Sequence, residues 1–177
     1  MKQVKLIFVV LLVLFYCSCD KITNIRVEAP MTAFFDFDLD SNDQSLNKSF
    51  TIDVNSVPEL QDYLDVIKDY TIKSVKIEVE NFQGQTTCVM NGDIKYSYAD
   101  QTSGILMTTF TNVDLASLYA SGNSYQVTPE TGAYDAMSDI LLATKKLKIY
   151  LNGFTDDVPA QGTIKIIIQT EAKVSIF

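Results

Sequence analysis

The sequence predicts a mainly β fold, an antiparallel β-sandwich that forms a single domain over residues 25–177 and carries two inserted amphipathic helices. Apolar and polar residues alternate with a period of two through most of the chain, which is typical of strands with one buried face. Only two segments show helical spacing, and strands and helices do not follow the βαβ order of a parallel sheet. No repeat or Pro/Gly-rich linker divides the chain, and its 47% hydrophobic content suits a folded domain. By analogy with common sandwiches, we expect immunoglobulin-like connectivity.

The expected strands follow from this alternation in chain order. Apolar residues at every second position mark five strands: Phe35, Phe37 and Leu39; Phe50, Ile52 and Val54; Val75, Ile77 and Val79; Ile94, Tyr96 and Tyr98; Leu147, Ile149 and Leu151. The first three sets are expected to face the core. The run 163–177, rich in Ile and Val, gives a C-terminal strand. Asn91-Gly92 fits a type I′ turn between two strands or a glycine bulge within one, and a bulge is favoured because 82–85 already predicts a turn.

The two helices are predicted from apolar residues at helical spacing. In the first, Pro58–Tyr70, the apolar face consists of Leu60, Tyr63, Leu64 and Ile67. In the second, Thr128–Thr144, Thr128 is expected to cap the helix and Pro129 to occupy its first position. Its apolar face consists of Tyr134, Met137, Ile140 and Leu141. A shorter helical turn is expected over Asp114–Tyr119.

The N-terminus has the pattern of a secretory leader. Lys2 and Lys5 precede an apolar run of eleven residues from Leu6 to Tyr16, which Asp20 ends. A membrane-spanning helix needs about 20 apolar residues, whereas the apolar part of a signal peptide has roughly 7 to 15. We therefore expect residues 1–18 to be a signal peptide.

The end of this run, Cys17-Ser18-Cys19, resembles the lipobox of bacterial lipoproteins, in which a small residue precedes an invariant cysteine. The sequence departs from the usual pattern at Tyr16, where the family more often has Leu, and at Cys17. The resemblance implies that Cys19 carries a diacylglycerol and a further acyl chain such as palmitate. It also implies that residues 19–24 form a short spacer and that the protein is anchored in the cell envelope, at the outer membrane of a Gram-negative bacterium. Ordinary secretory cleavage and a retained anchor stay open as alternatives.

The composition excludes several kinds of chemistry. The chain has no histidine, so Ser-His-Asp and Cys-His catalytic sites and Cys/His zinc sites are excluded. Cys88 is the single cysteine after the lipobox and is expected to be buried. No nucleotide-binding glycine loop occurs, and we expect no cofactor. The net charge of −8, with no basic cluster longer than Lys145-Lys146, argues against a nucleic-acid partner. We expect no enzymatic activity, although a pair of carboxylates across a cleft stays possible.

An acidic run provides weak candidates for a metal site: Asp36, Asp38, Asp40 and Asp43. Its alternating acids are similar to a calcium loop, but Ser41 and Asn47 stand where such a loop has Gly and Glu. We expect instead that Asp36 and Asp38 lie on the solvated face of an edge strand and that 40–43 forms a turn.

Two functions therefore compete. The first is a lipid-anchored envelope protein with a non-enzymatic binding or structural role, possible partners being an envelope protein or a glycan. Exposed edge strands of such domains can add a strand from a partner, and Ile164–Ile168 would favour this if it proved to be an uncovered edge. The second is a carbohydrate- or calcium-binding surface module, for which nine tyrosines offer stacking surfaces for sugars.

Overall fold

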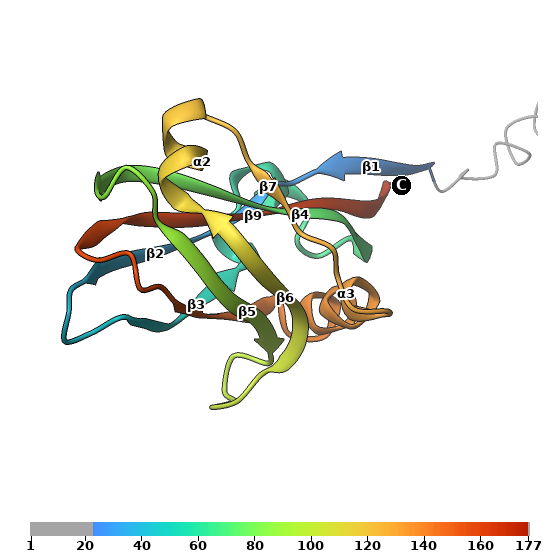
Figure 1. Ribbon diagram of the computed structural model, residues 1–177. Helices are drawn as coiled ribbons and strands as arrows, with labels where there is room; N and C mark the ends of the chain where they lie inside the picture. The colour runs from blue at the N-terminus through green and yellow to red at the C-terminus, as the bar shows by residue number, and fades with distance from the viewer. Residues whose placement is uncertain (1–22, 177) are drawn as a thin grey trace, which may run out of the picture.

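The computed structural model describes residues 23–176 and shows two antiparallel β-sheets packed face to face (Figure 1). The strands are β1 (Thr23–Glu28), β2 (Met31–Leu39), β3 (Ser45–Asp53), β4 (Ile67–Gly84), β5 (Val89–Ser97), β6 (Ile105–Asp114), β7 (Tyr125–Gln126), β8 (Lys146–Phe154) and β9 (Ala160–Ile176). The helices are η1 (Val54–Ser56), η2 (Pro58–Tyr63), α2 (Leu115–Ser121) and α3 (Ala133–Thr144). None of the helices formed by residues 23–176 is both long and apolar enough to cross a membrane. The β-sandwich predicted from the sequence is confirmed.

The connectivity is that of a jelly roll, so the expected immunoglobulin-like connectivity is wrong. Sheet A has the order β1-β9-β4-β7, with β2 also paired to β9, and sheet B has the order β3-β8-β5-β6. The first long strands, β2 and β3, therefore pair with the last two, β9 and β8. Among the described strands, only β5 and β6 are both consecutive and paired. Two sheets wound inward from both ends of the chain in this way are typical of a jelly roll.

The core lies between the sheets and contains the residues that the alternation assigned to it, except that Phe50 is only partly buried; Val54 is buried but lies in η1, after β3 ends at Asp53. Val75, Ile77 and Val79 of β4 are buried, as are Phe35, Phe37 and Leu39 of β2. The rings of Phe35 and Phe50 meet edge to face, with 6.4 Å between their centroids, and join the inner faces of the two sheets. The strand expected to include Tyr98 ends at Ser97, and Tyr98 is exposed.

The first expected helix, Pro58–Tyr70, is wrong. Residues Pro58–Tyr63 form only a 3₁₀ helix, and β4 begins at Ile67. The segment from Ile67 to Ile72 pairs with the last residues of β9, so backbone hydrogen bonds between strands outweigh a helical pattern in the sequence. Leu60 is still fully buried, because the 3₁₀ turn also places it against the core.

The second helix exists but begins later than expected. α3 starts at Ala133 after Gly132, whose φ of 79° suits glycine, instead of at Thr128 and Pro129. The segment before it is held against β6, since the Glu130 N–H donates to the Met107 carbonyl and the Thr108 hydroxyl to the Thr128 carbonyl. The expected apolar face is confirmed for Met137, Ile140 and Leu141, which are buried, and Tyr134 is half-buried.

Four smaller expectations can also be compared with the structure. The short helix expected at 114–119 is α2, capped by Asp114. Gly92 lies at a bulge of β5, where an added Cβ would lie 2.1 Å from the Asn152 carbonyl oxygen. The turn expected at 82–85 lies later, since β4 continues to Gly84. Thr23 and Asn24 belong to β1, so the last two residues of the expected spacer 19–24 lie in a strand, while the expected signal peptide 1–18 and Cys19 lie outside the described residues.

The two sides of the sandwich differ. On the first, which we call the open side, sheet A ends in β1 and β2, which pair with different parts of β9, and sheet B ends in β3; β2 and β3 are each nine residues long. On the second, which we call the covered side, the edge strands are β6 and the two-residue β7, and α2 and α3 connect them to the rest of the fold (Figure 1).

Candidate functional site

The start of β1 and the end of β9 lie at one end of the sandwich, and one group of loops lies at the opposite end (Figure 1). β1 begins beside the end of β9, where Thr23 pairs with Ile176. β2 runs away from this end, and its last residue, Leu39, pairs with Ala160 at the start of β9. The turn 40–44 and the loops 85–88 and 155–159 therefore form the end farthest from β1, which we call the distal end.

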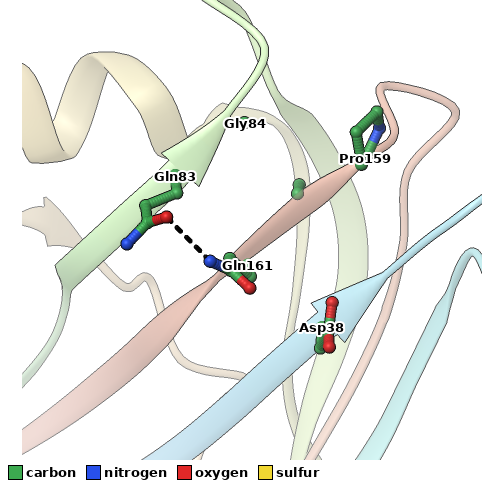
Figure 2. Close-up of a pocket in the computed structure, with 6 residues that line it drawn as sticks. Asp38, Gln83, Gly84, Pro159 and Gln161 are labelled. Atoms are coloured by element: carbon green, nitrogen blue, oxygen red, sulfur yellow. Dashed lines mark hydrogen bonds between the residues drawn. The ribbon is translucent and has the colours of Figure 1, made fainter.

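A pocket of about 200 Å³ opens at the distal end of sheet A. Three polar side chains line it from three neighbouring strands, because Gln161 of β9 pairs with Asp38 of β2 on one side and with Gln83 of β4 on the other. Figure 2 shows Gln161 between these two residues, with its Nε2 donating to Gln83 Oε1 at 2.9 Å. Within residues 23–176, no hydrogen bond reaches the Asp38 carboxylate. The pocket thus presents one free carboxylate beside a pair of bonded amides.

The wall of the pocket depends on a close approach of two strands. Gly84, with a φ of 152°, ends β4 against the start of β9, and a Cβ there would lie 2.6 Å from the Pro159 carbonyl oxygen. Gln85 Nε2 donates to the Val158 carbonyl at 3.4 Å and ties the following loop to the same segment. A larger residue at position 84 would force the two strands apart.

The four aspartates of the acidic run take the places expected of a strand face and a turn. Asp36 and Asp38 are exposed on β2, and Asp36 accepts a hydrogen bond from the Thr163 hydroxyl at 2.7 Å. Asp40 and Asp43 exchange backbone hydrogen bonds, and Asp40 Oδ1 also accepts from the N–H groups of Asn42 and Asp43. In the part of the chain that the structure describes, no three acidic, Cys or His side chains come together as a metal-ligand set.

Two further carboxylates at the distal end hold its loops in place. Asp157 Oδ2 accepts from the Val89 N–H at 2.8 Å, and Asp114 Oδ1 accepts from the N–H groups of Cys88 and Ala116. Burial by itself would raise the pKa of Asp114, but the Ser117 hydroxyl and three backbone N–H groups lower it below the ordinary 3.8. Cys88 is fully buried, as expected, and burial raises the pKa of its thiol. These hydrogen bonds join the loop 155–159 to the start of β5 and the loop 85–88 to the start of α2.

The distal end is uniformly acidic. Its strand ends and loops, residues 36–47, 82–92, 110–124 and 153–163, contain Asp but neither Lys nor Arg. Along β9, the next cation is Lys165, and it is held by Glu80 at 3.2 Å and Glu78 at 3.4 Å. The hydrogen bond to Glu80 is the main cause that raises the pKa of Lys165, and Glu78 adds to it. Asp36 and Asp38 thus remain uncompensated negative charges.

The exposed tyrosines do not form a stacking surface together. Tyr119 is 47% exposed on α2, where it packs on Phe82, and Tyr98 is 40% exposed after the other end of β5. A surface with two adjacent exposed tyrosines, expected for a carbohydrate module, is not formed by these two.

The sequence indicated part of this site. It placed Asp36 and Asp38 correctly on a solvated edge strand but did not indicate Gln83, Pro159 or Gln161. Their spacing in the chain carries no signal, because strand pairing far apart in sequence brings them together.

Comparisons with known proteins give no family. No family model matches the chain, and no curated protein does. Among solved structures, Desmodium yellow mottle tymovirus has a TM-score of 0.40 and 10% identity, covering 89% of this chain and 91% of that chain. Turnip yellow mosaic virus has a TM-score of 0.41 and 7% identity, covering 89% and 96%. Tobacco necrosis virus has a TM-score of 0.40 and 14% identity, covering 88% and 98%. Likenesses of this size say nothing about what this chain binds.

Proposed function

We propose that this protein is a lipid-anchored, non-enzymatic binding protein of the bacterial cell envelope, held at the outer membrane through Cys19. The observation that carries the proposal is the position of the first strand. β1 begins at Thr23, four residues after Cys19, and at the end of the sandwich opposite the pocket (Figure 1).

The short connection limits how far the domain can move from an anchored Cys19. Four residues span at most about 14 Å even when fully extended. A lipid on Cys19 would therefore hold the end with β1 close to the membrane surface and direct the distal end away from it. Two or more acyl chains are enough for stable attachment of this kind.

The groups at the distal end support a binding role more than a catalytic one. The pocket lining contains one carboxylate, Asp38, and the side-chain amides of Gln83 and Gln161, which are groups that bind polar ligands through hydrogen bonds. Asp114 and Asp157 accept hydrogen bonds from backbone N–H groups and hold the loops. The chain has no histidine to act as a general base.

The test is expression of the full chain in a Gram-negative host, followed by membrane fractionation and intact-mass measurement. We expect the wild-type protein in the outer-membrane fraction, cleaved before Cys19 and heavier by its acyl groups. Cys17→Ala is the matched control and should behave like the wild type, because residue 17 is removed with the leader. Cys19→Ala should lose the acyl mass and the cleavage before residue 19. Equal mass and fractionation of the wild type and Cys19→Ala would overturn the proposal.

A further inference from the structure

The outer edge of β2 has backbone groups free for a partner. β2 pairs with β9 in an unbroken register from Met31–Ile168 to Leu39–Ala160. Within residues 23–176, no hydrogen bond joins the backbone at its other edge to another element. Every second residue of β2 therefore offers its N–H and C=O outward, as in any edge strand.

This edge is also the most regular one in sheet A. At the opposite edge, β7 pairs with β4 only at Lys76 and Ile77, and β4 itself has three register shifts. β2 has nine residues without a bulge and no proline after Pro30. Bulges and short strands discourage added strands, and β2 has neither.

β3, the edge strand of sheet B on the open side, carries a charged residue that opposes an added strand, whereas β2 has no such residue on its core-facing side. Lys48 lies between Leu46 and Phe50 on the face of β3 that points toward the core, yet it is exposed. A strand added to β3 would have to displace or bury this ammonium group. In β2, all residues on the face that points toward the core are apolar and buried: Met31, Ala33, Phe35, Phe37 and Leu39.

The outward residues of β2 select the charge of a partner strand. Phe34, Asp36 and Asp38 are exposed on its outer face, and the nearest cation on β9, Lys165, is already paired with two glutamates. An apolar or acidic strand beside Asp36 and Asp38 would leave their charges uncompensated, whereas Lys or Arg at alternating positions would pair with them.

A second copy of this chain is a poor occupant of the edge. If two β2 strands paired antiparallel about a two-fold axis at Phe35, the two copies of Asp36 would be diagonal neighbours across the pair. The axis would also place the two β1 ends at opposite ends of the dimer. Two anchors at opposite ends could not both be held within about 14 Å of one membrane with the strands upright.

From these observations we infer that the free edge of β2 is a docking site for an extended, basic segment of a protein partner. The segment adds to sheet A as a further strand and places Lys or Arg side chains against Asp36 and Asp38. The inference deepens the proposed function and rests on it for the position of the edge, which is upright on the membrane and accessible to soluble or envelope partners.

The test uses the processed protein, purified from membranes in detergent, and a fluorescent nine-residue peptide of alternating Lys and Val. We expect saturable binding that weakens with added salt, and no binding of the same peptide with Glu in place of Lys. Two further peptides carry N-methyl groups on alternate backbone nitrogens, one at the odd and one at the even positions. Methylation of the set that faces β2 should abolish binding, and methylation of the other set should not. Tolerance of methylation in both sets would overturn strand addition, and absence of binding by the Lys peptide would overturn the docking site.

The double variant D36N/D38N tests the role of the two carboxylates. It should weaken binding of the Lys peptide on the order of tenfold, because two cross-strand charge pairs are lost. The matched control is D135N/D139N, which removes the same charge from two exposed positions on α3 and should bind like the wild type. Equal weakening by both variants would mean that overall charge decides, and would overturn the inference. None of these outcomes changes the fractionation of Cys19→Ala, so a failure here is distinguishable from a failure of the anchor.

Discussion

The covered side and the open side of the sandwich protect their edge strands in different ways. On the covered side, the chain between β6 and β8 forms α2, β7 and α3, which pack against β4 and the neighbouring strands. On the open side, β2 and β3 are joined by the turn 40–44, so no segment lies between these two strands in the chain to cover their edges. Interrupted strands and helices therefore protect the covered side, whereas on the open side Lys48 protects β3, and Asp36 and Asp38 of β2 select the charge of an added strand. The first kind of protection contributes to the core, and the second controls which partners can approach.

The largest expected effect is on the covered side, in α3. Leu141→Ala removes a fully buried side chain and should lower the free energy of unfolding by about 2–5 kcal/mol. Phe34→Ala on the open side is the matched control, because this residue is 47% exposed, and it should change stability by less than about 0.5 kcal/mol. Urea denaturation of both variants measures the difference. Equal losses would show that the open side contributes to the core as much as the covered side does.

An intermediate effect is expected at the cap of α2. Asp114→Ala removes the acceptor for the Cys88, Ala116 and Ser117 N–H groups and should cost about 1–2 kcal/mol. Asp38→Ala on the open side has no such partner and should cost less than about 0.5 kcal/mol. Because the folded pKa of Asp114 is lowered, its contribution is present above about pH 3.8 and is lost as the pH falls through the lower folded value. Urea denaturation from pH 7 down to pH 2.5 should show the wild type and Asp114→Ala converging in acid, and a constant gap would contradict this role.

The smallest effect on stability is expected at Lys48, the exposed charge that opposes strand addition to β3. Lys48→Ile should change the free energy of unfolding by less than about 0.5 kcal/mol but shift the protein toward dimers and larger species, because the open edge loses its charge. Lys173→Ile is the control, since Lys173 is exposed on β9, which has a paired strand on both sides. Sedimentation velocity of the two variants and the wild type compares their sizes. If Lys173→Ile associates as strongly as Lys48→Ile, hydrophobicity alone and not the edge is responsible.

The sequence predicted the candidate site in part: it indicated the residues whose exposure depends on a single strand and missed those that strand pairing brings together. Asp36 and Asp38 are exposed because they alternate with Phe35, Phe37 and Leu39, which is a local property of one strand. Gln83 and Gln161 reach Asp38 only through the pairing of β2, β9 and β4. The condition that Ile164–Ile168 be an uncovered edge, which would have favoured a protein partner at this run, is not met, because the run is paired with β2 on one side and β4 on the other.

The sequence by itself indicated which faces of β2 and β4 are buried and where the short helix α2 lies, because these depend on a residue and its near neighbours; at Asn91-Gly92 it favoured a bulge but left a turn open. Only the tertiary structure decided which strands are neighbours, and hence the jelly-roll connectivity, the pocket and the free edge of β2. It also decided that Ile67–Ile72 forms a strand, since pairing with β9 outweighs helical spacing. The physical reason is that alternation specifies the face of a strand but not its partner, which is set by backbone pairing and packing between residues far apart in the chain.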